Sequence, residues 1–236
     1  MQNIIENLAV VHQQIKLDAQ NAGRKESDVT LLCVSKTKSE DMIKAAYQAG
    51  ERHFGESYAL EAQGKITSLK AQGFNDIIWH FIGPIQSNKT KHIASHFDVV
   101  ESVDRIKILD RLNEQRPDGL PVLKIMIQVN ISQEEQKQGC DEQELEALLE
   151  HAASLPKLKV IGLMGVARID APEEELNASF AKLRALKDKY AKHYKELTEL
   201  SMGMTADMAQ AICQGSTEVR IGSAIFGARD YSKAKA

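Results

Sequence analysis

The chain has 236 residues, and its 43% hydrophobic and 27% charged content is ordinary for a soluble globular protein. Its formal net charge of -3 gives no general electrostatic reason to bind nucleic acid or an anionic membrane, so we expect neither partner. Three widely spaced cysteines, Cys33, Cys140 and Cys213, offer no disulfide framework or CxxC metal site and indicate reduced thiols.

The opening segment predicts an amphipathic helix, because apolar residues recur at helical spacing from Ile4 and Leu8 to Val11 and Ile15. This segment also carries charges and lacks the continuous apolar core of a signal peptide. No apolar stretch in the chain is long enough to span a bilayer. We therefore expect a cytoplasmic protein.

After this helix, short apolar runs alternate with helical patterns along the whole chain. The predicted strands are 31–35, 52–55, 79–83, 99–102, 122–130, 160–165, 199–202 and 218–226. The predicted helices lie near 39–49, 57–72, 88–96, 104–115, 141–154, 173–193 and 205–214.

Eight strands alternating with helices predict a single (β/α)8 TIM barrel, whose typical length is about 250 residues. We expect residues 1–236 to form one domain of this kind, with the N-terminal helix as an addition. A doubly wound open sheet is the rival fold. It usually carries a glycine-rich nucleotide motif after its first strand, and no such motif occurs here.

Lys36 directly follows the first predicted strand and is the most informative residue for function. A lysine at the end of a buried strand has its amine in or near a dry pocket, where desolvation lowers the amine pKa. A neutral amine is a nucleophile that forms a Schiff base with an aldehyde or ketone. The alternative is a structural lysine that extends its amine into solvent.

Two clusters of glycine and hydroxyl residues follow the last two predicted strands. Ser201, Gly203 and Thr205 surround the start of a predicted helix, and Gly222 and Ser223 lie in the final predicted strand. TIM barrels often bind phosphate at these two places, where backbone N–H groups and hydroxyls converge. Either cluster alone is typical of an ordinary turn, but their joint position predicts a phosphate site.

Arg220 interrupts the last apolar run. A guanidinium does not deprotonate, so a buried one needs a partner. That partner is either a carboxylate, Asp207 or Glu218, or an acceptor on a ligand in the barrel mouth. A lysine that forms imines, a phosphate site and an inward arginine together describe a site for pyridoxal 5′-phosphate (PLP).

The chain resembles the YggS/PROSC family of pyridoxal phosphate homeostasis proteins from about residue 30 onward. The segments that carry the resemblance are 34–38, 53–56, 79–89, 128–132, 162–164, 201–204 and 215–229. Two segments depart from the family pattern. Ser57 stands where the family has asparagine, and residues 165–168 read Gly-Val-Ala-Arg where the family tends to have Ala-Ile-Pro after the Gly-Leu-Met segment.

The resemblance implies a barrel similar to the N-terminal domain of alanine racemase, the fold type III of PLP proteins. It implies PLP as a Schiff base on Lys36, the phosphate near Ser201, Gly222 and Ser223, and Arg220 at the pyridine nitrogen. We include Gly203 in the predicted phosphate site. At Ser57 we expect the family's asparagine contact to be shortened or lost.

The function expected from this site is PLP homeostasis, in which the protein buffers or delivers the cofactor without catalytic residues of its own. We expect a monomer that binds PLP as a small-molecule ligand and contacts PLP-dependent apoenzymes transiently. The alternatives are a PLP-dependent amino-acid racemase or a related enzyme, and a cofactor-free Schiff-base aldolase.

A racemase that uses two bases needs an acid–base group on the face opposite Lys36. In racemases a second domain supplies it, and we expect no such domain in this chain. Tyr58 or Tyr231 would have to replace it. We expect no metal site, because His92 and His96 share a helix face but lack an obvious third ligand.

Overall fold

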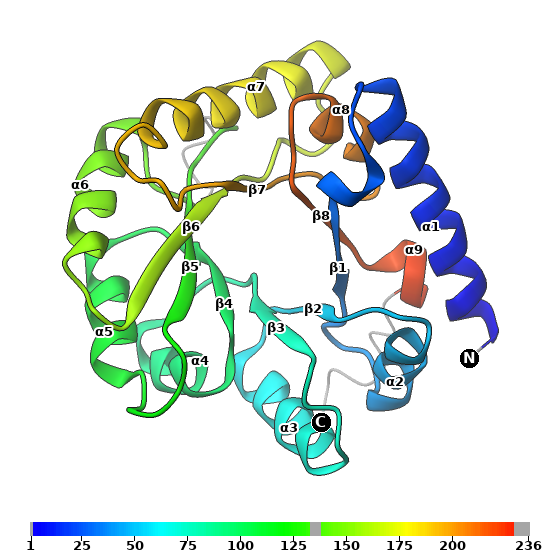
Figure 1. The fold of residues 1–236 in the computed structure, drawn as a ribbon, viewed down its shortest axis with the longest axis horizontal. Coiled ribbons are helices and arrows are strands. Elements are labelled where there is room, and N and C mark those ends of the chain that lie inside the picture. Colours follow the sequence, from blue (N-terminus) through cyan, green and yellow to red (C-terminus); the bar gives the residue numbers. More distant parts are fainter. Residues whose placement is uncertain (1, 133–137, 229–236) are drawn as a thin grey trace.

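The computed structural model describes residues 2–132 and 138–228, and within them eight parallel strands close into a barrel. The strands follow one another around the ring in chain order, and β8 pairs with β1 to complete it (Figure 1). The strands are β1 Thr30–Val34, β2 His53–Glu56, β3 Ile78–Phe81, β4 Val99–Val103, β5 Leu123–Gln128, β6 Leu158–Met164, β7 Glu199–Ser201 and β8 Glu218–Ile221. The predicted (β/α)8 barrel is confirmed.

The helices form an outer ring around the strands (Figure 1). They are α1 Gln2–Asn21, α2 Glu40–Gln48, α3 Ala59–Ala71, α4 Thr90–His96, α5 Ile106–Gln115, α6 Glu142–Ala153, α7 Glu173–Tyr190, α8 Met208–Cys213 and α9 Ser223–Phe226, with 3-10 turns at Glu26–Asp28 and Ser87–Lys89. In the described part of the chain, no helix combines the length and the apolar character needed to cross a membrane.

The predicted N-terminal helix is confirmed as α1, which lies outside the barrel against α2, α8 and α9 (Figure 1). Its apolar stripe is buried, with Leu8 and Ile15 almost fully enclosed. Burial of an apolar stripe against neighbouring helices is what stabilises an amphipathic helix in a globular protein.

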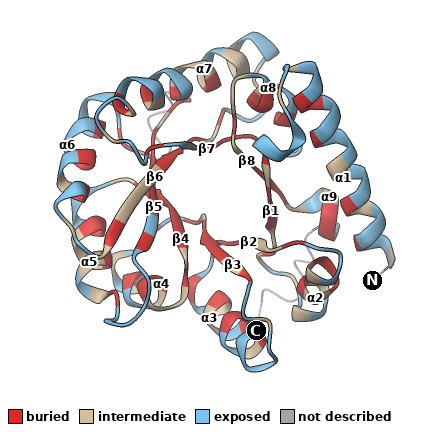
Figure 2. Ribbon diagram, in the orientation of Figure 1, coloured by how far each residue is buried: buried red, intermediate tan, exposed pale blue. Residues whose placement is uncertain are grey.

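Two environments make up the interior, which is red in the burial view of Figure 2. Between strands and helices lies the main apolar core, with Phe54, Trp79 and Phe81 among its largest buried side chains. A small apolar cluster of Val99, Met126 and Met164 lies apart from this main core. The buried side chains of His80 and Glu218 line a cavity together with Val99 and Met126 of this smaller cluster.

The last strand is shorter than the sequence pattern predicts. The predicted strand 218–226 ends at Ile221, because Gly222 leaves the extended conformation with φ -120° and ψ -73°. The amides of Ile225 and Phe226 then donate to the Gly222 carbonyl and form the short helix α9. The nine residues predicted as one strand are thus a strand followed by a helical turn, which period-two patterning does not separate.

Candidate cofactor site

A cavity of about 420 Å³ lies at the ends of β1 and β8. These are the C-terminal strand ends, where the active sites of TIM barrels are found. Its lining residues are Val34, Lys36, Lys38, Ile82, Val166, Met204, Thr205, Ala206, Arg220, Gly222, Ser223 and Gly227. Five residues singled out in the sequence therefore meet at one cavity: Lys36, Thr205, Arg220, Gly222 and Ser223.

Lys36 is half-buried and lies two residues beyond the end of β1. The next residue, Thr37, has a φ of 65°, a left-handed conformation that is strained for a β-branched side chain. The Thr37 amide donates to Oε1 of Glu61 at 2.8 Å, and Lys65 holds the same oxygen. The backbone beside Lys36 is therefore held in a fixed, strained shape, a feature that clusters at functional sites.

Lys38 connects the loop after β1 to the end of α9 by hydrogen bonds. Its Nζ donates to the carbonyl oxygens of Phe226 at 3.2 Å, Gly227 at 2.8 Å and Ala228 at 2.8 Å. Sequence reasoning missed this cavity-lining role. The signal was present as a second lysine two residues after Lys36, but the sequence does not reveal that α9 ends beside it.

Arg220 lies on β8 with its guanidinium buried and its side chain lining the cavity. Nη1 donates to Oγ of Ser201 at 2.6 Å, and Nη2 donates to the Gly165 carbonyl at 2.9 Å. These two contacts, not the Asp207 or Glu218 ion pairs considered from the sequence, hold the guanidinium in place. Asp207 instead accepts from the Met204 amide.

Gly222 lets β8 approach β1 closely beside the cavity. A Cβ on Gly222 would lie 3.2 Å from the Val34 carbonyl oxygen and 3.3 Å from the Val34 Cβ. Contacts this short leave little room for a side chain. The neighbouring Ser223 begins α9, so its hydroxyl and the first turn of this helix lie at the cavity wall.

Three predicted site residues, Ser57, Ser201 and Gly203, are not among the residues that line the cavity. Ser57 is buried after β2 with its backbone close to Gly83, where an added Cβ would meet the Ser57 carbonyl at 2.3 Å. The Ser201 hydroxyl is bonded to Arg220 and Glu101. Gly203 has a φ of 98°, and its carbonyl accepts from the Arg220 amide at 3.0 Å.

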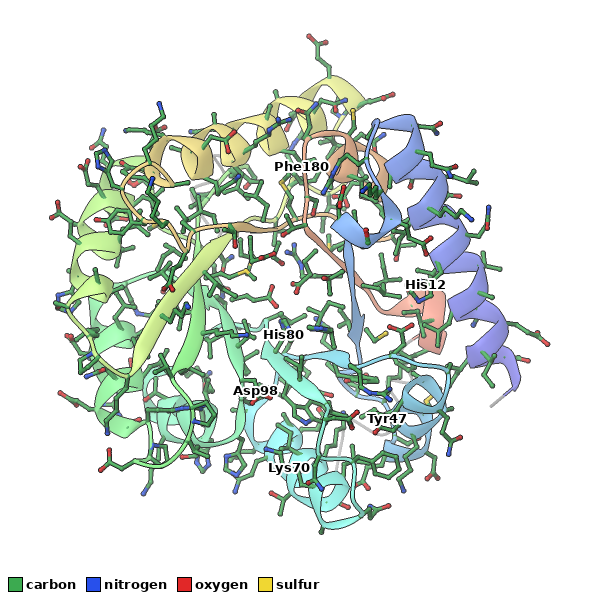
Figure 3. All side chains as sticks on the ribbon, viewed as in Figure 1. His12, Tyr47, Lys70, His80, Asp98 and Phe180 are labelled. Carbon is green, nitrogen blue, oxygen red and sulfur yellow. The ribbon has the colours of Figure 1, made fainter. Side chains whose placement is uncertain are left out.

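A cluster of ionisable side chains is linked to Arg220 through Ser201. Its members are His80, Glu101 and Glu218. Figure 3 shows the labelled His80 inside the ring of strands. Nδ1 of His80 lies 2.7 Å from Oε1 of Glu101 and 3.5 Å from Oε2 of Glu218. Buried charges require such pairing. Glu101 was not predicted from the sequence to have a role. A carboxylate in the middle of the apolar run Val99–Val103 was the signal.

Burial and mutual charge set the protonation of this cluster. Burial and the neighbouring Glu101 raise the pKa of Glu218 to about 8. Burial opposes a charge on His80, but Glu218 and Glu101 outweigh it and raise the His80 pKa. Burial also opposes a charge on Glu101, but the hydrogen bond and charge of His80 outweigh it and lower the Glu101 pKa. At neutral pH Glu218 is thus largely protonated and Glu101 is ionised, and the two carboxyl groups favour the protonated form of His80.

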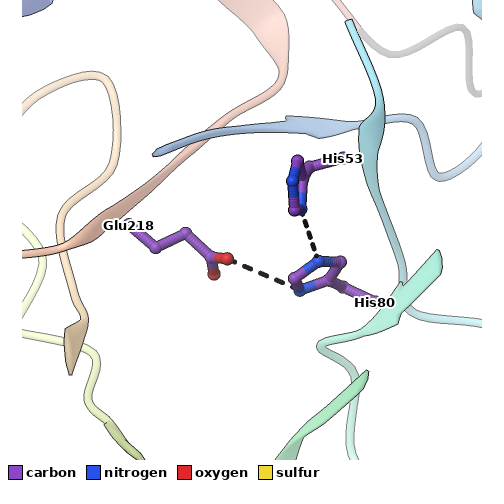
Figure 4. Close-up of side chains that lie close together, drawn as sticks. All are labelled: His53, His80 and Glu218. Carbon is purple, nitrogen blue, oxygen red and sulfur yellow. Dashed lines mark hydrogen bonds and ion pairs between the residues drawn. The ribbon is translucent and has the colours of Figure 1, made fainter. Parts of the chain in front are cut away.

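His53, His80 and Glu218 are of metal-ligating types and offer atoms within 4.8 Å of one another (Figure 4). However, Nδ1 of His80 faces Glu101, and Nε2 of His80 lies 3.0 Å from Nδ1 of His53. Since both His80 nitrogens are engaged, this group is a hydrogen-bonded cluster in the structure. Of the other two histidines weighed from the sequence, His92 bonds to Gln63 and His96 to a backbone carbonyl.

Comparison of the sequence with known families identifies the class of protein. The family described as alanine racemase, N-terminal domain, matches residues 7–230, and the chain belongs to this family. Alanine racemase from Corynebacterium glutamicum has the same fold, with a TM-score of 0.66 and 18% identity over 98% of this chain and 62% of that one.

Full-length relatives carry a more specific name. The pyridoxal phosphate homeostasis protein of Escherichia coli strain K12 is 46% identical over 99% of this chain and 100% of its own length. That of Pseudomonas aeruginosa is 49% identical over 98% of each chain. PipY of Synechococcus elongatus, solved with PLP bound, has a TM-score of 0.82 and 32% identity over 95% of this chain and 100% of its own. The chain is thus a member of the pyridoxal phosphate homeostasis protein family.

Proposed function

We propose that the protein binds PLP reversibly as a Schiff base on Lys36 and acts in PLP homeostasis, buffering and delivering the cofactor. The observation that carries this proposal is the meeting of Lys36, Arg220 and Ser223 at one cavity. Its volume of about 420 Å³ is in the range of small-molecule sites, which is roughly 300–1,000 Å³. The names of the relatives and the PLP-bound PipY support the same function.

The residues at the cavity match the chemical groups of PLP. Its aldehyde condenses with an amine, which Lys36 supplies. Gly222 and Ser223 at the start of α9 offer backbone N–H groups and a hydroxyl to the phosphate, as helix starts commonly do. We assign Arg220 to the pyridine nitrogen. Ser57, Ser201 and Gly203 then act from outside the cavity lining, with Ser201 and Gly203 supporting Arg220.

The proposed arrangement disfavours strong catalysis on amino acids. PLP labilises an amino acid by drawing electrons into a protonated pyridine ring. Arginine is a permanent donor, so it favours an unprotonated ring nitrogen and weakens that electron sink. Tyr58, one candidate for the second base, is exposed and is not part of the cavity lining. Tyr231, the other candidate, lies outside the described residues.

The finer parts of the proposal concern partners, assembly and location. We propose that residues 1–236 act as a single domain and a monomer in the cytoplasm, and that PLP passes to apoenzymes in transient contacts. Size-exclusion chromatography tests the monomer. Transfer is tested by mixing the PLP-loaded protein with an apoenzyme and following the recovery of that enzyme's activity.

A PLP titration followed by visible absorbance tests the proposed function. We expect the wild type to bind one PLP per chain with a Schiff-base spectrum. Lys36→Ala should lack this spectrum while keeping some affinity through the phosphate contacts. Lys70→Ala is the matched control, because Lys70 is an exposed lysine on α3. An unchanged spectrum in Lys36→Ala, or no PLP uptake by the wild type, would contradict the proposal.

A further inference from the structure

A continuous chain of side-chain hydrogen bonds runs from the cofactor cavity through the barrel. It starts at Arg220, whose Nη1 lies 2.6 Å from Oγ of Ser201. Ser201 lies 2.6 Å from Oε2 of Glu101, and Oε1 of Glu101 lies 2.7 Å from Nδ1 of His80. Nε2 of His80 lies 3.0 Å from Nδ1 of His53 (Figure 4).

The far end of this chain reaches a second cavity of about 420 Å³, lined by His53, Lys124 and Glu218 among others. His53 and Glu218 are the first residues of β2 and β8, so this cavity lies at the N-terminal mouth of the barrel. His53 is half-buried, while His80 and Glu101 are fully buried. The two mouths of the barrel are therefore joined by five hydrogen-bonded side chains.

The donors and acceptors along this chain of hydrogen bonds are consistent with a protonated His80. Arg220 donates to Ser201, and Ser201 donates to the Glu101 carboxylate. A protonated His80 has two N–H groups, one for Glu101 and one for a neutral His53. Glu101 thus accepts one hydrogen bond from Ser201 and one from His80, so its carboxylate holds both neighbours in the hydrogen-bonded chain.

We propose that Glu101 is a positioning residue that fixes Arg220 through Ser201, and that protonation of the cluster at the N-terminal mouth controls PLP affinity at the other mouth. This inference rests on the proposed function, because bound PLP provides its readout. Coupling of this kind requires a physical element that both sites bias, which here is the hydrogen-bonded chain.

Glu218 is the group that changes charge nearest neutral pH. It faces His80 and Glu101 and feels the charge of Arg220, and its pKa is about 8. As the pH rises through that value, Glu218 ionises and competes with Glu101 for His80. It also adds negative charge near Arg220. Both effects weaken the binding of an anionic ligand.

Two histidines of the hydrogen-bonded chain have shifted pKa values of their own. Burial and the charge of His80 lower the pKa of His53 to about 4, with Glu51 and Lys124 as further neighbours. His80 feels Asp98 in addition to its two carboxylates, and all three raise its pKa. We assign the step near pH 8 to Glu218, because its pKa is about 8.

Two isosteric substitutions in the same cluster test the proposal by PLP titration between pH 6.5 and 9. Glu101→Gln should weaken PLP affinity about tenfold at pH 7, within the usual range of site-to-site coupling. Glu218→Gln imitates the protonated acid, so it should bind PLP like the wild type at pH 7. It should also lose the decline in affinity that the wild type shows above pH 8.

His151→Gln is the matched control. His151 lies outside the chain of hydrogen bonds, and its Nε2 lies 2.6 Å from Oδ1 of Asp110. Unchanged or tighter binding by Glu101→Gln would overturn the positioning role. An equal alkaline decline in Glu218→Gln and the wild type would overturn the pH control, and this comparison decides the matter if Glu101→Gln does not fold. A wild type that takes up no PLP would instead refute the proposed function itself.

Discussion

At the scale of single residues, the proposed contact of Ser223 with the phosphate predicts that this serine affects the binding of PLP but not of pyridoxal. Ser223→Ala removes a hydroxyl at the cavity wall, so PLP affinity should fall about tenfold, as expected for a hydrogen bond to a charged group of about 1.5 kcal/mol. Affinity for pyridoxal, which lacks the phosphate, should not change. Titrations of the wild type and the variant with both ligands provide the measurement.

Ser95→Ala is the control for this prediction, since the Ser95 hydroxyl bonds only to the Lys91 carbonyl on α4 in the described structure. The wild type should prefer PLP over pyridoxal by at least about a hundredfold, because several such bonds are lost together. Equal loss of affinity for both ligands in Ser223→Ala would show that this serine does not contact the phosphate.

The residues that line the cavity were predicted better than the buried residues that support them. Lys36 and Arg220 stand out in the sequence as cations next to or within apolar runs. Glu101 and His80 also interrupt apolar runs, but their meaning depends on which strands face each other across the barrel. That depends on closure of the ring, which local sequence patterns do not describe.

At the scale of elements, Gly162 limits how β6 and β7 pack. A Cβ at this position would lie 2.3 Å from the Glu199 carbonyl oxygen, a backbone atom that cannot rotate away. Gly162→Ala should therefore destabilise the protein by about 2–3 kcal/mol through overpacking. Chemical denaturation with urea, at constant m-value, measures this change in the free energy of unfolding.

Gly64→Ala is the matched control on helix α3. A Cβ there meets no atom within 4 Å, and alanine favours helix over glycine by about 0.5–1 kcal/mol. The control should therefore stabilise the protein slightly. A loss of stability in Gly64→Ala as large as in Gly162→Ala would contradict the packing explanation.

The order and type of the elements were predictable because helical and strand periodicities alternate along the chain. The residues at which these elements begin and end were less predictable. The predicted strand 122–130 is Leu123–Gln128 in the structure, and the predicted helix 88–96 begins with the 3-10 turn Ser87–Lys89. Backbone hydrogen bonds at an element's end depend on its neighbours, and the sequence pattern alone does not show them.

At the scale of the whole molecule, the buried cluster predicts how stability depends on pH. The pKa of Glu218 is raised to about 8, so between about pH 4.5 and 8 the unfolded chain ionises this group while the folded protein does not. Its contribution to stability therefore declines as the pH rises through this window. The raised pKa of His80 acts in the same direction above about pH 6.5.

Glu218→Gln removes the contribution of Glu218 to this pH dependence. Relative to the wild type, the variant should gain at least about 1 kcal/mol more stability at pH 8 than at pH 5, as proton linkage requires. Urea denaturation of both proteins at the two pH values measures the difference. The same change in stability at both pH values would mean that Glu218 ionises normally in the folded protein.

The central claim is that Lys36 carries PLP. Borohydride reduction of the PLP-loaded wild type fixes the Schiff base as a stable amine, and peptide mass mapping then locates it. We expect a pyridoxyl group on the peptide that contains Lys36. A pyridoxyl group found only on another lysine, such as the neighbouring Lys38, would contradict it.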